Sequence, residues 1–145
     1  MPSIWFTADF HFGHNNIIRY CNRPFRSVEE MDQTIIERLN APVKANDILL
    51  FSSGISVSEA RRGSWSTVGR FAARRSLRCP EISVNGQPIV LCHYAMRVSN
   101  RSHHGAWHLY GHSHGNLPEG PTSLSMDVGI PMTFARGIST KSAGC

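Results

Sequence analysis

The apolar and polar positions of the first fifty residues predict a strand, a loop and a helix. Residues 3–8 are rich in β-branched and aromatic side chains, and the run ends at Asp9, where the Gly and Asn content of "DFHFGHNN" is typical of a loop. Ser27 and Glu30 then have the spacing of a capping box, which marks the start of a helix. Apolar residues follow at helical spacing up to Pro42: Val28, Met31, Ile35, Ile36 and Leu39. This pattern predicts an amphipathic helix that packs on a sheet.

Strand patterns return on both sides of a stretch that has no period. Residues 47–51 form a short apolar run that predicts a second strand, whereas residues 53–79 show neither the helical nor the strand period. Two β-rich runs then flank Asn85 and Gly86, a pair that strongly predicts a hairpin. The second of these runs ends on His93.

Two further short strands are predicted near the end of the chain. Residues 107–110 form one of them, which breaks at Gly111, and "SLSMDVG" forms the other. Residues beyond 130 show no pattern. Because short strands accompany an amphipathic helix, the chain is expected to fold as a single α/β domain over residues 1–145.

Length and cysteine usage are typical of an intracellular domain. The 145 residues, with a mass of 16.2 kDa, suffice to bury one core. The longest apolar runs are far too short for a membrane span, and "MPSIWFTADF" lacks the features of a secretory leader, so we expect a soluble, cytoplasmic protein. The cysteines are widely scattered without a CxxC pair, which favours free thiols: Cys21, Cys79, Cys92 and Cys145.

The formal charge of +5 comes from one segment of the chain. Residues 51–79 contain six arginines and one glutamate, which accounts for the whole excess, and the rest of the chain is balanced. This segment lacks the aromatic interleaving of a groove that binds single-stranded nucleic acid. Nucleic acid is therefore a disfavoured partner, although a basic binding module at residues 61–78 stays open as an alternative.

Ligand-type side chains follow three of the predicted strands. They come as two pairs at i and i+2 and one single residue: Asp9 and His11, His112 and His114, and His93. Alternate residues of an extended segment face the same way, so each pair can reach one metal centre from one side. Imidazole mixed with carboxylate favours zinc, manganese or iron over calcium. A single histidine is more often a surface or core residue, but this grouping at three strand ends favours a metal site.

The motifs "DFH", "LCHY" and "YGHSHG" resemble those of the calcineurin-like metallophosphoesterases, in particular the small bacterial and phage branch. The resemblance covers residues 3–50 and 81–130. It implies a four-layer αββα sandwich, incomplete in residues 51–79 and in the C-terminal tail, with metals at the C-terminal ends of its strands.

The resemblance also implies a ligand set and a reaction. Asp9, His11 and His114 would hold one metal, and His93 and His112 the other. In the intact family, two metals clamp the phosphoryl group and a hydroxide attacks phosphorus, which hydrolyses a phosphate ester substrate. Other residues are candidates to contact substrate or ordered water: His14, Asn15, Asn16, His103, His104 and His108. For His108 the alternative is a strand residue facing the sheet, and Tyr94 is expected to pack.

Two family motifs are absent from the sequence. Gly54 stands where the family has the aspartate that bridges both metals, and residues 51–92 contain no counterpart of the Gly-Asn-His-Asp motif. Two cations repel each other without a shared anion, so the second site should be weak or empty. We therefore expect one divalent metal ion (Mn, Fe or Zn) or none in this chain, and impaired catalysis. A non-catalytic member with a single structural metal is the alternative.

A shifted reading frame would explain the missing motifs. If the codons of residues 53–58 are read one base earlier, they can spell Leu-Gly-Asp-Phe-Ser-Phe, and the start of segment 131–145 can similarly spell His-Asp-Phe-Arg-Pro-Trp. We hypothesise that residues 51–79 and 131–145 are translated out of frame, with a further deletion. The alternative is a divergent loop insertion. The coding DNA decides between them, because the hypothesis fails if the shifted triplets do not encode Gly-Asp.

Overall fold

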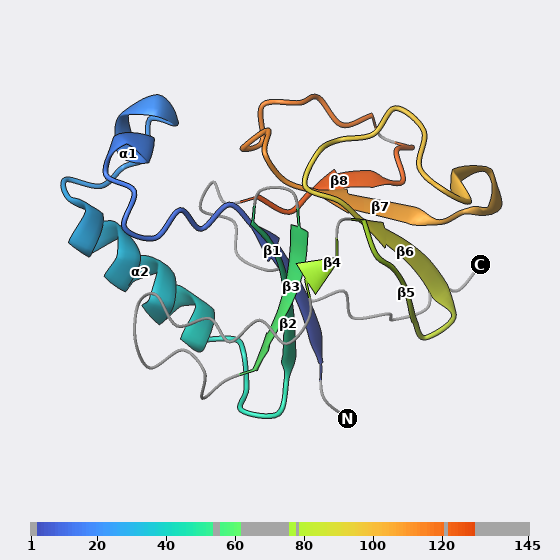
Figure 1. Ribbon diagram of the computed structural model, residues 1–145, viewed down its shortest axis with the longest axis horizontal. Helices are drawn as coiled ribbons and strands as arrows, with labels where there is room; N and C mark the ends of the chain where they lie inside the picture. Colours follow the sequence, from blue (N-terminus) through green and yellow to red (C-terminus); the bar gives the residue numbers. More distant parts are fainter. Residues whose placement is uncertain (1–2, 54–55, 62–75, 78, 121, 130–145) are drawn as a thin grey trace.

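In the residues that it describes, the computed structural model is a mixed α/β fold with two four-stranded sheets and few helices (Figure 1). The structure describes residues 3–53, 56–61, 76–77, 79–120 and 122–129. No helix within these ranges has the length and apolar character needed to cross a membrane. The mixed α/β class predicted from the sequence is confirmed.

The first sheet has the strand order β1-β2-β3-β4. Its strands are β1 (Ile4–Ala8), β2 (Ile48–Ser53), β3 (Ser56–Arg61) and β4 (Ser76–Leu77). Strands β1 and β2 are parallel, with Ile4 opposite Ile48, whereas β3 pairs antiparallel with both β2 and β4. Because β1 and β2 run in the same direction, their C-terminal ends lie at the same edge of this sheet.

The second sheet has the order β5-β6-β7-β8. Its strands are β5 (Glu81–Val84), β6 (Gln87–Leu91), β7 (Trp107–Tyr110) and β8 (Ser125–Asp127). Strands β5 and β6 form the predicted hairpin, in which Asn85 and Gly86 take φ angles of 49° and 84° that a type I′ turn requires. Strands β6, β7 and β8 are parallel, so they also deliver their C-terminal ends to one edge.

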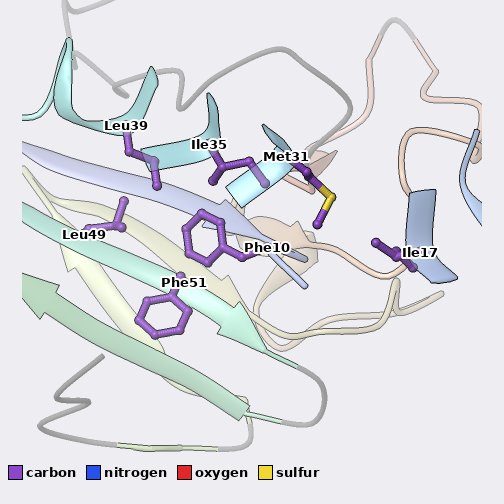
Figure 2. Close-up of a cluster of buried hydrophobic side chains, with 7 residues drawn as sticks. All are labelled: Phe10, Ile17, Met31, Ile35, Leu39, Leu49 and Phe51. Carbon is purple, nitrogen blue, oxygen red and sulfur yellow. The ribbon is translucent and has the colours of Figure 1, made fainter. Parts of the chain in front are cut away.

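Alternation along β1 and β2 builds two cores on opposite faces of the first sheet. Phe6 packs with Ile89, Leu91 and Leu109 of the second sheet, so the two sheets bury their facing sides against each other. Leu49 instead packs on the other face, with the helices (Figure 2). That helix-facing core comprises Phe10, Ile17, Met31, Ile35, Leu39, Leu49 and Phe51.

Helix α2 (Val28–Asn40) forms where the capping box predicted it. The Ser27 hydroxyl accepts a hydrogen bond from the Glu30 N–H at 3.1 Å, which satisfies one of the free donors of the first turn. The helix buries Met31, Ile35 and Leu39 against the sheet. The described residues thus form three layers: helix, sheet, sheet. A second helical layer is not found within the described ranges, and the four-layer sandwich stays a prediction.

Several local predictions differ from the structure. Residues 53–79 were expected to lack regular structure, but they contain β3 and β4. The predicted loop after β1 gives way at residue 16 to a short helix, α1 (Asn16–Tyr20), and a 3-10 turn, η1, covers Ser102–His104. These elements are too short to produce a hydrophobic period. Gly54 and residues 130–145 lie outside the described residues.

The prediction of free thiols is wrong for two cysteines. The structure pairs Cys79 with Cys92 as a disulfide, whereas Cys21 is a free thiol. The two partners are 13 residues apart in sequence and come together because the chain folds back through the β5–β6 hairpin. Spacing in the sequence carries no signal for such a pair.

Candidate metal centre

The end of β1 delivers the first two ligand-type side chains. Asp9 directly follows the strand and is 3% exposed, while His11 is partly buried. Asp9 and His11 both have left-handed backbone conformations, with φ angles of 59° and 54°. The i and i+2 pair therefore leaves the strand along a tightly curled loop rather than along an extended segment.

The ends of β6 and β7 supply the other three histidines. His93 lies two residues beyond β6 and is 5% exposed. His112 and His114 follow β7 with φ angles of 65° and 49°. His112 is exposed at the surface, and His114 is partly buried. As the parallel strands imply, all five residues come from C-terminal strand ends.

Gly111 lets β7 approach β1 closely enough for these ends to meet. A Cβ atom placed on Gly111 would lie 2.5 Å from the Ala8 Cβ and 2.6 Å from Asp9 Oδ2. The backbone N–H of the next residue, His112, donates a 2.7 Å hydrogen bond to the same Asp9 Oδ2. The Asp9 carboxylate is therefore held directly against the backbone of the β7 loop.

The site has two parts that share Asp9. One ligand atom each from Asp9, His11 and His114 lie within 4.8 Å of one another, close enough to surround one cation. In the other part, His93 Nδ1 lies 3.6 Å from Asp9 Oδ1, and His93 Nε2 lies 3.2 Å from His112 Nδ1. The structure thus brings the five candidate ligand residues close together.

The side chains of the first part have the properties that a metal requires. A carboxylate and two imidazoles are a donor set that suits zinc, manganese or iron. The buried Nδ1 of His114 has no hydrogen-bond partner in the described part of the chain. A buried polar atom is rarely left without a partner, so this nitrogen fits a role as a metal ligand.

Burial keeps three of the histidines neutral near pH 7. It lowers the pKa of His11, His93 and His114 below the ordinary value of 6.5, and the nearby Asp9 carboxylate opposes this effect only in part. For His11, the positive charge of Arg23 also lowers the pKa. Only a neutral imidazole can bind a metal, so the pKa shifts favour coordination at and below neutral pH.

The remaining candidate histidines lie in different settings. His14 is exposed and its ring centroid lies 5.6 Å from that of His11, so it borders the site. His103 and His104 are exposed in η1 and contact each other, with ring centroids 4.2 Å apart. His108 is 1% exposed and hydrogen-bonded to the backbone of Met96. It is a buried residue of β7, in line with the alternative prediction for this histidine. Tyr94 packs edge-on against His93 and His112.

Three charged residues near the site were not singled out from the sequence. Asp127 ends β8 and accepts hydrogen bonds from the N–H groups of Gly115 and Gly129. The strand-end argument that found the histidines could also have found this aspartate. Arg23 and Asp32 are buried and hydrogen-bond to the loop after β1. No sequence pattern marks these two residues.

Comparison with known proteins finds one informative relative. The chain is 31% identical, over an alignment of 162 residues, to the "Uncharacterized protein MJ1445" of Methanocaldococcus jannaschii, with 96% of this chain and 88% of the relative covered. The alignment is longer than the 145 residues of this chain, so the relative has positions without a counterpart here. No family model and no solved structure matches the chain.

Proposed function

We propose a function for this chain, which belongs to the same family as the Methanocaldococcus jannaschii protein: it is a metal-dependent phosphoric ester hydrolase whose activity is impaired. Asp9, His11 and His114 would hold one divalent cation. His93 and His112 would form a second site of much lower affinity. The substrate would be a phosphate ester.

One observation carries this proposal. Ligand atoms of Asp9, His11 and His114 converge to within 4.8 Å of one another at the C-terminal ends of strands from both sheets. His114 lies more than 100 residues from Asp9 and His11 in sequence, so local chain geometry does not explain why it meets them. The unpartnered, buried Nδ1 of His114 supports the same assignment.

The chemistry of such a centre suits phosphate esters. A divalent cation held there would offset the negative charge of the ester and lower the pKa of a water molecule. The exposed His14 lies beside His11, with ring centroids 5.6 Å apart, and would contact a phosphoryl oxygen there. Asp9 is held in place by the His112 N–H, so its orientation does not depend on the cation.

The impaired activity follows from the incomplete second site. His93 and His112 provide two imidazoles to the second site. Asp9, which the first site would use, lies with its Oδ1 3.6 Å from His93 Nδ1, and its Oδ2 accepts a hydrogen bond from the backbone N–H of His112. A bound cation pair needs a shared anion to offset its repulsion, and the family's position for that residue falls at Gly54, outside the described residues. The archaeal relative has aligned positions without a counterpart in this chain, as a lost segment would leave.

Metal content and hydrolysis test the proposal together. The protein would be loaded with Mn²⁺, freed of excess metal and analysed for metal per chain, then incubated with bis(4-nitrophenyl) phosphate. We expect about one Mn²⁺ per chain and slow turnover. The Asp9→Asn variant should lose both the bound Mn²⁺ and the turnover. The control Glu29→Gln removes an exposed carboxylate from α2 and should keep the bound Mn²⁺ and the turnover.

Three outcomes would contradict the proposal. Absence of bound metal in the wild-type protein would remove the metal centre and with it the hydrolase function. Two Mn²⁺ per chain with rapid turnover that His112→Ala abolishes would show an intact two-metal enzyme instead. Bound metal without any turnover would favour the alternative of a single structural metal.

A further inference from the structure

We propose that Arg23 is a positioning residue: its guanidinium holds the backbone of residues 9–13 in the conformation that presents Asp9 and His11 to the cation. The role in metal binding rests on the function proposed above. The role in loop conformation does not, because every contact that supports it lies within the protein.

The loop after β1 has an unusual backbone. Asp9, His11 and Gly13 have φ angles of 59°, 54° and 71°, so every second residue is left-handed. Residues other than glycine rarely take this conformation, because the Cβ atom crowds the backbone. Such a conformation persists where the surrounding structure enforces it. Some group outside the loop must therefore favour it.

Arg23 makes the contacts that this loop needs. Its Nη2 donates to the Asp9 carbonyl at 2.7 Å, and its Nη1 donates to the Phe10 carbonyl at 3.1 Å. Successive carbonyls of a strand point in opposite directions, so one guanidinium reaches both only when the chain curls as it does at Asp9. The planar fork of arginine suits two neighbouring acceptors. The contact is thus specific for the curled loop.

Asp32 holds the other end of the same loop. Its Oδ2 accepts a 3.0 Å hydrogen bond from the N–H of Gly13. Arg23 and Asp32 are 8% and 7% exposed, yet Arg23 Nε and Asp32 Oδ1 have no hydrogen-bond partner in the described part of the chain. The hydrogen bond of Asp32 goes to the backbone of the loop. Those of Arg23 go to the same loop and to Met31, whose Sδ lies 3.4 Å from Arg23 Nη1.

If Arg23 acted only through its charge, its removal would change metal affinity in the opposite direction from the removal of a positioning residue. A positive charge close to Asp9 and His11 disfavours a second cation, so neutralising Arg23 would strengthen metal binding if charge alone mattered. If Arg23 positions the loop, its removal weakens binding despite the lost repulsion. The direction of the change distinguishes the two roles.

Co²⁺ titration of the full chain measures this direction, because the visible absorption bands of bound Co²⁺ report both affinity and ligand geometry. We expect Arg23→Met to weaken Co²⁺ binding by roughly 10- to 100-fold, as for other residues that orient metal ligands, and to alter the bands. Arg23→Lys keeps the charge but cannot contact both carbonyls with a rigid fork, so it should also weaken binding. The matched control Arg19→Met changes an exposed arginine of α1 and should bind as the wild type does.

Unchanged or tighter Co²⁺ binding by Arg23→Met, or wild-type affinity and spectrum in Arg23→Lys, would overturn the positioning role. A second readout needs no metal. Amide hydrogen exchange at Gly13 should be faster in both Arg23 variants than in the wild type, while exchange within α2 at Ile35 stays the same. Equal exchange at Gly13 would overturn the inference even if the wild-type protein bound no Co²⁺, which is the outcome that would contradict the proposed function.

Discussion

At the scale of single residues, the site depends on how closely two strand ends approach. Gly111 lies against Ala8 and the Asp9 carboxylate. Gly129 is also close to this carboxylate, because a Cβ atom added to Gly129 would lie 2.7 Å from Asp9 Oδ2. Glycine at these positions allows backbone to contact the carboxylate directly. A single methyl group there is enough to disturb the ligand set.

Gly111→Ala should therefore impair the metal centre. The added Cβ would displace Asp9, and we expect metal affinity to fall by roughly tenfold or more and stability by about 1–3 kcal/mol. Gly120→Ala is the matched control, because an added Cβ at Gly120 meets no atom within 4 Å. Mn²⁺ titration and urea unfolding of both variants measure the two effects. Wild-type Mn²⁺ affinity in Gly111→Ala would show that the Asp9 contact does not matter.

The sequence identified the candidate ligand residues better than it identified the residues that support them. Asp9, His93 and His114 each follow a predicted strand, and their residue types at three strand ends were enough to group them. The same-face rule for extended segments did not contribute, because the loop after β1 is curled at Asp9 and His11. Arg23 acts through backbone carbonyls that face it only in the folded loop. Such a contact has no periodicity and no spacing rule, so nothing in the linear sequence distinguishes Arg23 from an exposed arginine.

At the scale of elements, His108 fastens the segment after β6 to strand β7. Its Nε2 accepts a 3.1 Å hydrogen bond from the Met96 N–H, and its Nδ1 lies 3.3 Å from the Val90 carbonyl. These contacts fit a neutral ring that carries its proton on Nδ1. Burial lowers the pKa of His108 below 6.5, although the Val90 carbonyl opposes this. The segment held in this way begins beside His93.

Stability should accordingly fall in mild acid. The pKa of His108 is lower in the folded than in the unfolded protein. The neutral ring therefore contributes fully to the free energy of unfolding above pH 6.5, and this contribution is lost as the pH falls through the pKa of the folded protein. His108→Gln keeps an acceptor for Met96 but cannot be protonated, so its stability should depend less on pH. At neutral pH we expect it to cost roughly 1–3 kcal/mol. Urea unfolding at pH 7.5 and pH 5 measures both quantities. Equal pH dependence in the two proteins would contradict this role.

Elements with a clear period or a specific turn signal were predictable. Strand β7, the β5–β6 hairpin and helix α2 all formed where their patterns indicated. Helix α1 has five residues and no side-chain cap, so neither periodicity nor capping could reveal it. Strands β3 and β4 lie in the arginine-rich segment, where no alternation marks one buried face. The pairing of β3 with β2, and of β4 with β3, is a tertiary effect.

At the scale of the whole molecule, the candidate metal centre lies where the two sheets meet. Asp9 and His11 follow a strand of the first sheet, and His114 follows a strand of the second. The isolated parallel bridge between Ala8 and Gly129 is a backbone connection at the same place. A cation bound to all three side chains would link the sheets, in addition to the apolar contacts between them. Metal binding and global stability should therefore be coupled.

Divalent metal should raise the thermal unfolding midpoint. A ligand that binds only the folded state at about 100 times its dissociation constant adds roughly 2.7 kcal/mol, which shifts the midpoint by several degrees for a domain of this size. His114→Ala removes the ligand from the second sheet, so it should eliminate most of the shift, and a chelator should reverse it in the wild type. Tyr20→Ala, at a 77% exposed residue, should keep the full shift. Calorimetry with and without Mn²⁺ measures this, and an equal shift in His114→Ala would show that the stabilising metal does not join the two sheets.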